Sequence, residues 1–281
     1  MPLRLLAAGK TDVGLQREQN EDAFDKKVMG DSASSGIFIV SDGMGGYHAG
    51  EIASQIAVET ITGALAPLLD PNTPATTVKL TPRDAKRKTK KNGKKDASVA
   101  ESTTSTSDAV VSDAVVSDAA VSDAAVTGAD ESAPDDFNPL ETRALSESIG
   151  VDHYSGKVSE AVRLANSAIV EYGESHKDAR GLGATVTAAF IVDGQAFIAN
   201  VGDSRTYLIR DGKIARVTRD HSLVQRLVEM EQIAADEVYE HPSRNLIYRS
   251  LGAGHTDVDV DIFHERLRVG DTLLLCCDGL W

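Results

Sequence analysis

The stretch Ile37-Phe38-Ile39-Val40-Ser41-Asp42-Gly43-Met44-Gly45-Gly46 decides the fold of this chain. Its leading apolar residues predict a short buried strand, and a long helical pattern begins beyond it, near Ala49. The strand delivers the Asp42 carboxylate beside three glycines, which let a ligand approach the main chain closely. Carboxylate and carbonyl oxygens suit a hard cation such as Mg²⁺ or Mn²⁺, although an Asp-Gly pair is also typical of a plain turn.

Composition limits the class of protein. The chain has 281 residues, of which 41% are hydrophobic, so it is long enough to bury a core in one large domain or two. Its formal net charge of −14 argues against a nucleic-acid binder, because a phosphate backbone would be repelled. The adjacent Cys276 and Cys277 would point to opposite faces of a strand, which predicts reduced, buried thiols rather than a disulfide or a metal clip.

The sequence predicts a cytoplasmic protein with no membrane segment in this chain. It contains no run of apolar residues of the length, roughly 18, that a spanning helix needs. The apolar stretch 1–8 is too short for a signal peptide and has no convincing cleavage site.

A second acidic group precedes the strand, in Arg17-Glu18-Gln19-Asn20-Glu21-Asp22. Such a stretch is often a solvated loop. In a functional interpretation, Glu21 and Asp22 join Asp42 around a cation, and the planar guanidinium of Arg17 grips a phosphate.

Residues 70–150 differ in composition from the rest of the chain. A basic block between Lys79 and Lys95 is followed by a Ser-Asp-Ala-Val-Val type repeat that starts at Ser107. A period of five fits neither a helix nor a strand, so the valines gather on no single face. We expect a disordered insertion within a single domain over 1–281. The basic block either docks an acidic partner or a membrane surface or, as we favour, is a solvated linker.

Regular structure is expected again from Lys157. Apolar spacing predicts a helix over 158–172, and apolar runs at 186–192, 195–201, 206–209 and 214–217 predict strands. The Asp193-Gly194 and Asp211-Gly212 turns between them indicate an antiparallel meander. A helical segment from Leu223, a surface excursion over 229–249, and strands at 258–263 and 271–277 complete the pattern.

Acidic residues recur at predicted strand ends or adjoining loops: Glu21, Asp22, Asp42, Asp203 and Asp278. If they converge, their mutual repulsion selects for divalent cations. A pair of metals would share a bridging water, lower its pKa and deliver hydroxide onto phosphorus, with Arg17 holding the phosphoryl oxygens. No Ser-His-Asp order or activated cysteine is evident, and His221 is expected to cap a helix or to pack rather than to act as a catalyst.

Ordered motifs across the chain resemble those of the metal-dependent serine/threonine protein phosphatases of type 2C, in their bacterial form. They are Arg17 with Asn20-Glu21-Asp22, Asp42-Gly43-Met44-Gly45-Gly46, Gly183-Ala184-Thr185, Gly202-Asp203-Ser204-Arg205, Asp220-His221-Ser222 and Cys277-Asp278-Gly279-Leu280-Trp281. The resemblance implies an α+β fold, a four-layer α-β-β-α sandwich with two central antiparallel sheets flanked by helix pairs. It also implies Mn²⁺ or Mg²⁺, two ions and a third, in a cleft between the sheets.

The resemblance further implies roles for individual residues. Asp42 corresponds to the carboxylate that bridges two metals, and Gly43 to a residue whose carbonyl oxygen is a ligand. Glu21 matches the ligand of one metal and Asp278 that of the other. Asp22 matches an acceptor that orients metal-bound water.

Other positions match family features outside the sites of these two metals. Asp203 is similar to a ligand of a third, weaker metal, shared with Asp278, and Arg17 corresponds to the phosphate-binding arginine. The segment Leu223–Arg249 takes the place of the family's flap, which is thought to influence substrate choice. Ala184 stands where the family usually has Thr, a change that we expect to affect packing only.

The expected function is hydrolysis of phosphoserine and phosphothreonine on proteins, opposing a bacterial-type serine/threonine kinase. Family members continue beyond the Asp278 motif to a final Asp-Asn pair, whose Asp is another ligand, and this pair is not in the sequence. We therefore expect a C-terminally incomplete domain. The alternative is a catalytically weak phosphoprotein-binding or regulatory module.

Overall fold

The computed structural model describes residues 3–15, 17–29, 34–45, 49–69 and 139–281, with the backbone alone described over 139–149. The basic block and the repeat of the expected insertion lie outside these residues, and so does Gly46 of the glycine motif. The described elements share one compact unit, drawn from both sides of that segment.

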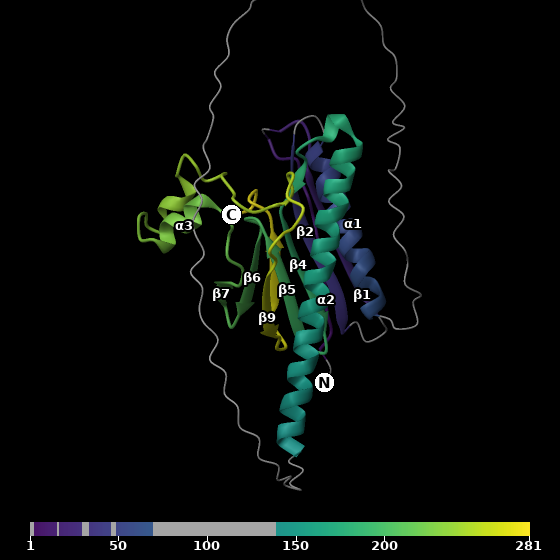
Figure 1. Ribbon diagram of the computed structural model, residues 1–281. Coiled ribbons are helices and arrows are strands. Elements are labelled where there is room, and N and C mark those ends of the chain that lie inside the picture. Colours follow the sequence, from purple (N-terminus) through teal and green to yellow (C-terminus); the bar gives the residue numbers. More distant parts are fainter. Residues whose placement is uncertain (1–2, 16, 30–33, 46–48, 70–138) are drawn as a thin grey trace, which may run out of the picture. The chain divides into compact units, whose positions relative to one another are not determined.

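The larger of two antiparallel sheets has seven strands in the order β8-β3-β2-β4-β5-β9, with β1 paired to β2. These strands occupy the centre of Figure 1. Their bounds are β1 Asp22–Met29, β2 Ser35–Met44, β3 Gly183–Ala184, β4 Val186–Val192, β5 Gln195–Val201, β8 Leu251–Gly252 and β9 Asp261–Arg266.

The smaller sheet contains β10 (Thr272–Cys276), β6 (Arg205–Arg210) and β7 (Lys213–Arg216), in that order. The predicted Asp-Gly turns join β4 to β5 and β6 to β7. Both residues of each turn have positive φ, at 50° and 73° in the first and 52° and 70° in the second. This is the geometry of a type I′ hairpin turn, whose twist matches that of the strands, so both predicted turns are confirmed. The two hairpins lie in different sheets and β5 does not pair with β6, so the prediction of one continuous meander is wrong.

Two long helices, α1 (Ala49–Leu69) and α2 (Pro139–Ser175), cover one face of the larger sheet (Figure 1). By length and composition α1 is able to cross a membrane. Its side chains Ala53, Ala57 and Ile61 are fully buried in the core between α2 and the sheet, however. We therefore interpret α1 as the core helix that the sequence predicted.

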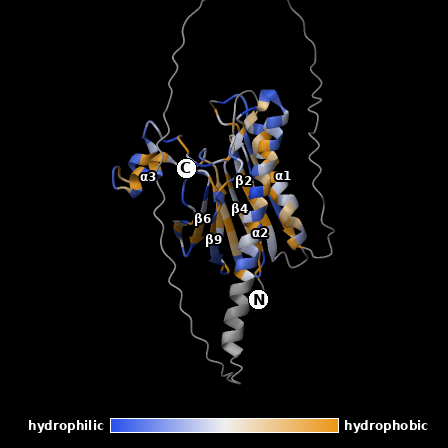
Figure 2. Ribbon diagram, viewed as in Figure 1, coloured by the Kyte–Doolittle hydropathy of each residue, from blue (hydrophilic) through white to orange (hydrophobic). Residues whose placement is uncertain are grey.

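Alternation along the strands divides the hydrophobic core into two clusters. On β4, Ala188 and Phe190 face the helices, whereas Ala189 and Ile191 pack against residues of β10 such as Leu273. The second cluster therefore fills the space between the two sheets. Figure 2 shows the hydrophobic residues gathered on these strands and on α1.

The two antiparallel sheets and the α1–α2 layer confirm the predicted α+β sandwich in three of its four layers. A helix pair on the outer face of the smaller sheet is not among the described elements. The remaining helical elements are short: α3 Leu223–Glu229, and the 3-10 turns η1 Lys177–Ala179 and η2 Glu237–Tyr239.

Several boundaries differ from the sequence prediction. β1 was not predicted, because the charged Asp25, Lys26 and Lys27 hide its alternation. β2 continues through Asp42 to Met44 instead of ending at Val40. α2 begins at Pro139, well before Lys157, so the expected end of the insertion at residue 150 falls inside a helix. Proline suits a first helical position, since it lacks the N–H that would be unpaired there.

Candidate metal centre

Asp42 lies on β2 directly opposite Asp22 on β1. Because side chains alternate along a strand, Asp42 shares the face of Phe38, which packs between the two sheets. Like charges directly opposite each other in an antiparallel pair repel. The β1–β2 register thus places two carboxylates side by side at one end of the space between the sheets.

Two further carboxylates approach this pair from the other segments. Asp278 follows β10 and hydrogen-bonds to Asp42, while Asp203 follows β5. Burial, reinforced by the charges of Asp22, Asp278 and Asp203, raises the pKa of Asp42 to about 8. Burial and then the charge of Asp278 raise the pKa of Asp203 to about 6. Negative charge is concentrated here beyond what nearby cationic side chains offset, which is the electrostatic signature of a functional site.

Cys277 belongs to the same centre, a placement that the sequence did not predict. Its Sγ donates a hydrogen bond to Asp22 Oδ2 at 3.3 Å, and one ligand atom each from Cys277, Asp22 and Asp42 lie within 4.8 Å of one another. Burial, with the charge of Asp22, raises the pKa of the Cys277 thiol to about 12. Both cysteines are free, as predicted, and Cys276 is buried. The signal was position: Cys277 immediately precedes Asp278.

Glu21 and Gly43 lie beside the carboxylate pair. The Gly43 N–H donates to the Glu21 carbonyl at 3.1 Å, which ties the start of β1 to the end of β2. A Cβ on Gly43 would lie 1.9 Å from the Gly50 carbonyl oxygen, and one on Gly50 would lie 2.5 Å from Glu21 Oε1. Only glycine permits this approach of α1 to β2. The Glu21 carboxylate therefore lies against the start of α1, whereas Asp22 is the residue in close contact range of Asp42.

Arg17 is at the edge of the centre. Its Nη1 is 3.7 Å from Glu21 Oε2, and its side chain is 62% exposed. Its charge also lowers the pKa of Asp22, against the larger effect of burial, which raises it. Arg17 therefore keeps guanidinium donors directed to solvent next to the acidic group.

A hydroxyl pair joins Thr185, which contacts Asp42, to Ser204, which follows Asp203. Thr185 Oγ1 and Ser204 Oγ are 2.7 Å apart and buried. Thr185 also exchanges backbone contacts with Asp42, since its N–H donates to the Asp42 carbonyl at 2.8 Å and the Asp42 N–H donates to Thr185 Oγ1 at 3.3 Å. The Gly183-Ala184-Thr185 motif thus braces the acidic centre.

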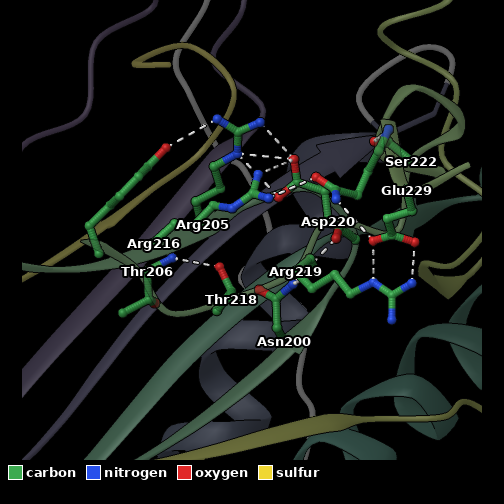
Figure 3. A network of polar contacts seen from close by, with 12 residues as sticks. Asn200, Arg205, Thr206, Arg216, Thr218, Arg219, Asp220, Ser222 and Glu229 are labelled. Carbon is green, nitrogen blue, oxygen red and sulfur yellow. Dashed lines mark hydrogen bonds and ion pairs between the residues drawn. The ribbon is translucent and has the colours of Figure 1, made fainter. Parts of the chain in front are cut away.

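The side chains of the motif Asp220-His221-Ser222 make structural contacts, and Figure 3 shows the surroundings of Asp220 and Ser222. Asp220 accepts three hydrogen bonds from Arg205, at 2.7 to 3.1 Å, and both side chains are almost fully buried. Ser222 caps α3 by accepting from the Gln225 N–H at 3.3 Å. His221 is buried and packs rather than capping the helix, and burial, with the nearby Arg249 charge, lowers its pKa.

The donor set of the centre fits a hard divalent cation. Carboxylates from Asp22, Asp42, Asp203 and Asp278 gather in one region, and Gly43 follows Asp42 on β2. Mg²⁺ and Mn²⁺ prefer oxygen ligands of this kind. Burial and neighbouring negative charge raise the pKa values of Asp42 and Asp203, so a bound cation would favour the ionised form of both carboxyls.

Comparisons with known proteins agree with this geometry. A family model described as Protein phosphatase 2C matches residues 15–280. The serine/threonine phosphatase stp of Listeria monocytogenes is 30% identical over 271 residues, covering 96% of this chain and 76% of that protein. The serine/threonine protein phosphatase PstP of Mycobacterium tuberculosis is 41% identical over 124 residues, 44% of this chain and 24% of that one.

Solved structures give the same result. The crystal structure of the Mycobacterium tuberculosis serine/threonine phosphatase PstP/Ppp has a TM-score of 0.58 at 28% identity, covering 96% of this chain and 77% of that one. The catalytic domain of PstP in complex with 2 manganese ions has a TM-score of 0.56 at 26% identity, covering 96% and 76%. Since the family match spans nearly the whole chain, including each motif of the acidic centre, this chain belongs to the protein phosphatase 2C family of metal-dependent serine/threonine phosphatases.

Proposed function

We propose that this chain hydrolyses phosphoserine and phosphothreonine in proteins at the centre around Asp42, with Mn²⁺ or Mg²⁺ as cofactor. The observation that carries the proposal is the convergence of carboxylates whose mutual repulsion and burial raise the pKa of Asp42 to about 8. Divalent cations relieve that repulsion. The solved catalytic domain of PstP in complex with 2 manganese ions supports the choice of cation.

We assign the cation ligands residue by residue. Asp42 would be a ligand of both of two cations, Glu21 and the Gly43 carbonyl would complete one site, and Asp278 would belong to the other. Asp203, with Asp278, would hold a third and weaker cation. When bound, such cations lower the pKa of coordinated water and stabilise charge on phosphoryl oxygens.

The chain's own side chains orient the reactants. Arg17 has exposed guanidinium donors beside the centre, in the fork geometry that matches phosphoryl oxygens. Asp22 Oδ2 accepts a hydrogen bond from the Cys277 thiol, which leaves Asp22 Oδ1 to accept a hydrogen bond from the attacking water. Water adds to phosphorus, the bond from phosphorus to the seryl or threonyl oxygen breaks, and that oxygen takes a proton. The products are the free hydroxyl side chain and inorganic phosphate.

The substrates we propose are phosphorylated proteins, including those of a bacterial-type serine/threonine kinase that this enzyme opposes in the cytoplasm. The bacterial phosphatases among its relatives support this setting. The segment Leu223–Arg249 presents exposed apolar side chains such as Met230, Tyr239 and Leu246, which supports a contribution to substrate choice.

The test is Mn²⁺-dependent release of phosphate from a phosphothreonine peptide. We expect Asp42→Asn to abolish release and Arg17→Ala to raise KM for the peptide. Asp193→Asn is a matched control, because Asp193 occupies the β4–β5 turn at the opposite end of the sheet. Full turnover by Asp42→Asn would refute the bridging assignment, and an unchanged KM for Arg17→Ala would refute the phosphate role. Tight peptide binding without any turnover would make the chain a phosphoprotein-binding module.

A further inference from the structure

His221 holds the residue that precedes Asp203 through both of its backbone groups. The Gly202 N–H donates to His221 Nδ1 at 3.0 Å, and the His221 N–H donates to the Gly202 carbonyl at 2.9 Å. Gly202 has φ +102, and a Cβ there would lie 2.6 Å from the Thr185 side chain. The turn that presents Asp203 is therefore a special backbone conformation, fixed on one side by Thr185 and on the other by His221.

The other ring nitrogen of His221 faces a charged pair. Because Nδ1 accepts a hydrogen bond, the neutral ring carries its proton on Nε2, which donates to Asp261 Oδ2 at 3.1 Å. Arg249 donates from Nη1 to the second oxygen of Asp261 at 2.8 Å and lies 2.9 Å from Nε2. Asp261 thus fixes both the tautomer and the orientation of the imidazole, and Arg249 fixes Asp261.

Both ends of the segment Leu223–Arg249 meet at the same histidine. The Tyr248 N–H donates to the His221 carbonyl at 2.9 Å, and the Leu223 N–H donates to the Leu246 carbonyl at 2.8 Å. An isolated β-bridge pairs Ser222 with Ile247 beside them. His221 is thus the point where the base of this segment contacts the Gly202–Asp203 turn.

We propose that His221 is a positioning residue for the Asp203 carboxylate and couples it to the base of the segment Leu223–Arg249. The imidazole touches neither substrate nor cation, and it acts through the backbone of Gly202. The inference rests on the proposed function in one respect, that Asp203 binds a cation. Movement of the segment base shifts His221, and with it the carboxylate that completes the weaker cation site.

Three substitutions separate the two ring contacts. His221→Asn places an amide oxygen where Nδ1 accepts from Gly202, but it does not reach Asp261. His221→Gln places an amide group where Nε2 lies and loses the acceptor for Gly202. His221→Leu loses both contacts. Glu229→Gln is the control. Glu229 lies on the segment Leu223–Arg249, and the substitution removes its ion pair with Arg219 but none of the contacts of His221.

The measurement is Mn²⁺ binding to the metal-free chain, followed by the electron paramagnetic resonance signal of free Mn²⁺. We expect a tight class of sites that Asp42→Asn removes and a weaker class that Asp203→Asn removes. His221→Leu and His221→Gln should weaken the second class about tenfold or more, within the range seen when groups that orient metal ligands are lost, and leave the first class unchanged. His221→Asn and Glu229→Gln should bind like the unmodified chain.

Coupling is reciprocal, so cations should also protect the segment base. We expect Mn²⁺ at concentrations that fill the weaker class to slow hydrogen exchange of the Leu223 and Tyr248 amides. This protection should disappear in His221→Gln while the tight class of sites persists. Exchange at both amides that does not respond to Mn²⁺ in the unmodified chain would refute the coupling.

The outcomes separate the inference from the proposed function. If the unmodified chain binds no Mn²⁺, the proposed function is overturned. A tight class with no binding that depends on Asp203, or a weaker class that His221→Leu and His221→Gln leave unchanged, would overturn the inference alone. If His221→Leu fails to fold, as judged by circular dichroism, the comparison of His221→Gln with His221→Asn decides the question.

Discussion

Two groups of buried charged side chains differ in how their charges are balanced. In the acidic centre, Asp22 and Asp42 face each other across two strands, and burial with like charge raises the pKa of Asp42 to about 8. In the network behind it, Asp220 is paired with Arg205 and Arg216 (Figure 3). Burial lowers the pKa of Arg205, but its hydrogen bonds to Asp220 and the charge of Asp220 outweigh that effect, so the net pKa is raised. Buried charges that are already paired belong to the fold, and those left with surplus charge belong to a ligand.

The two regions share one short motif. In Gly202-Asp203-Ser204-Arg205, Asp203 contributes to the acidic centre while Arg205 turns to the network. The charge of Asp220 raises the pKa of Asp203, and that of Arg205 lowers it. A substitution of Arg205 or Asp220 is therefore expected to change the pKa of Asp203 in the acidic centre. The contrast can be tested by substitutions in either region.

The largest effect should come from breaking the paired region. Arg205→Met removes the buried partner of the Asp220 carboxylate, which is 1% exposed, and leaves it paired with the partly exposed Arg216. Removing one member of a buried ion pair costs about 3 to 5 kcal/mol, so we expect a loss of that order in the free energy of unfolding. Urea unfolding followed by circular dichroism measures it.

A double variant tells pairing from packing. Arg205→Met with Asp220→Leu removes both charges, and we expect it to recover much of the lost stability, because no unpaired buried charge remains. A single Arg205→Met that unfolds at the same urea concentration as the unmodified chain would contradict the contrast between the two regions.

The next effect concerns the acidic centre and has the opposite sign. In the metal-free chain near neutral pH, the raised pKa of Asp42 means that folding protonates this carboxyl, which costs stability. Asp42→Asn removes that cost, so we expect stability to stay equal or to rise by about 1 kcal/mol, as at sites that exchange stability for function. In the unmodified chain, Mn²⁺ at about 100 times its Kd should add about 2.7 kcal/mol, and in Asp42→Asn this gain should be absent. Thermal unfolding with and without Mn²⁺ measures both.

Stability of the metal-free chain should also depend on pH in a defined direction. The pKa of Asp42 rises from 3.8 unfolded to about 8 folded, and that of Asp203 rises to about 6. Between these limits the folded chain binds more protons than the unfolded chain, so the contribution of these groups falls as pH rises from about 4 to 8. We expect the gain in Tm from Mn²⁺ to be larger at pH 8 than at pH 5. An equal gain at both values would show that the carboxylates are not protonated in the metal-free centre.

The sequence predicted the parts of this contrast that depend on local pattern. Alternating apolar residues and Asp-Gly turns located β4 to β7, and strand ends marked Asp42, Asp203 and Asp278 as a group. It did not predict β1, although the Asp22–Asp42 register depends on it, because mixed charges break the apolar alternation there. The assignment of metal roles to the individual residues stays a prediction.

Partners far apart in the chain were beyond the reach of the sequence pattern. The sequence places Cys277 next to Asp278, but it does not name Asp22 as the acceptor of the thiol, nor Gly202 as the donor to a ring nitrogen of His221. The motifs predicted which residue types belong to the site. Which side chain hydrogen-bonds to which partner follows from the packing of the two sheets. His221 was expected to cap or to pack, and the cap of α3 is its neighbour Ser222.

The smallest effect is expected for an ion pair that is exposed to solvent instead of buried. Arg219 and Glu229 form an ion pair like that of Arg205 and Asp220, but their side chains are 59% and 29% exposed. Solvent screens such a pair, so we expect Glu229→Gln to change the free energy of unfolding by less than about 1 kcal/mol and to leave the acidic centre unaffected. Urea unfolding beside Arg205→Met compares the two pairs directly. A loss as large as that of Arg205→Met would mean that charge pairing itself, rather than burial of the pair, sets the stability of this region.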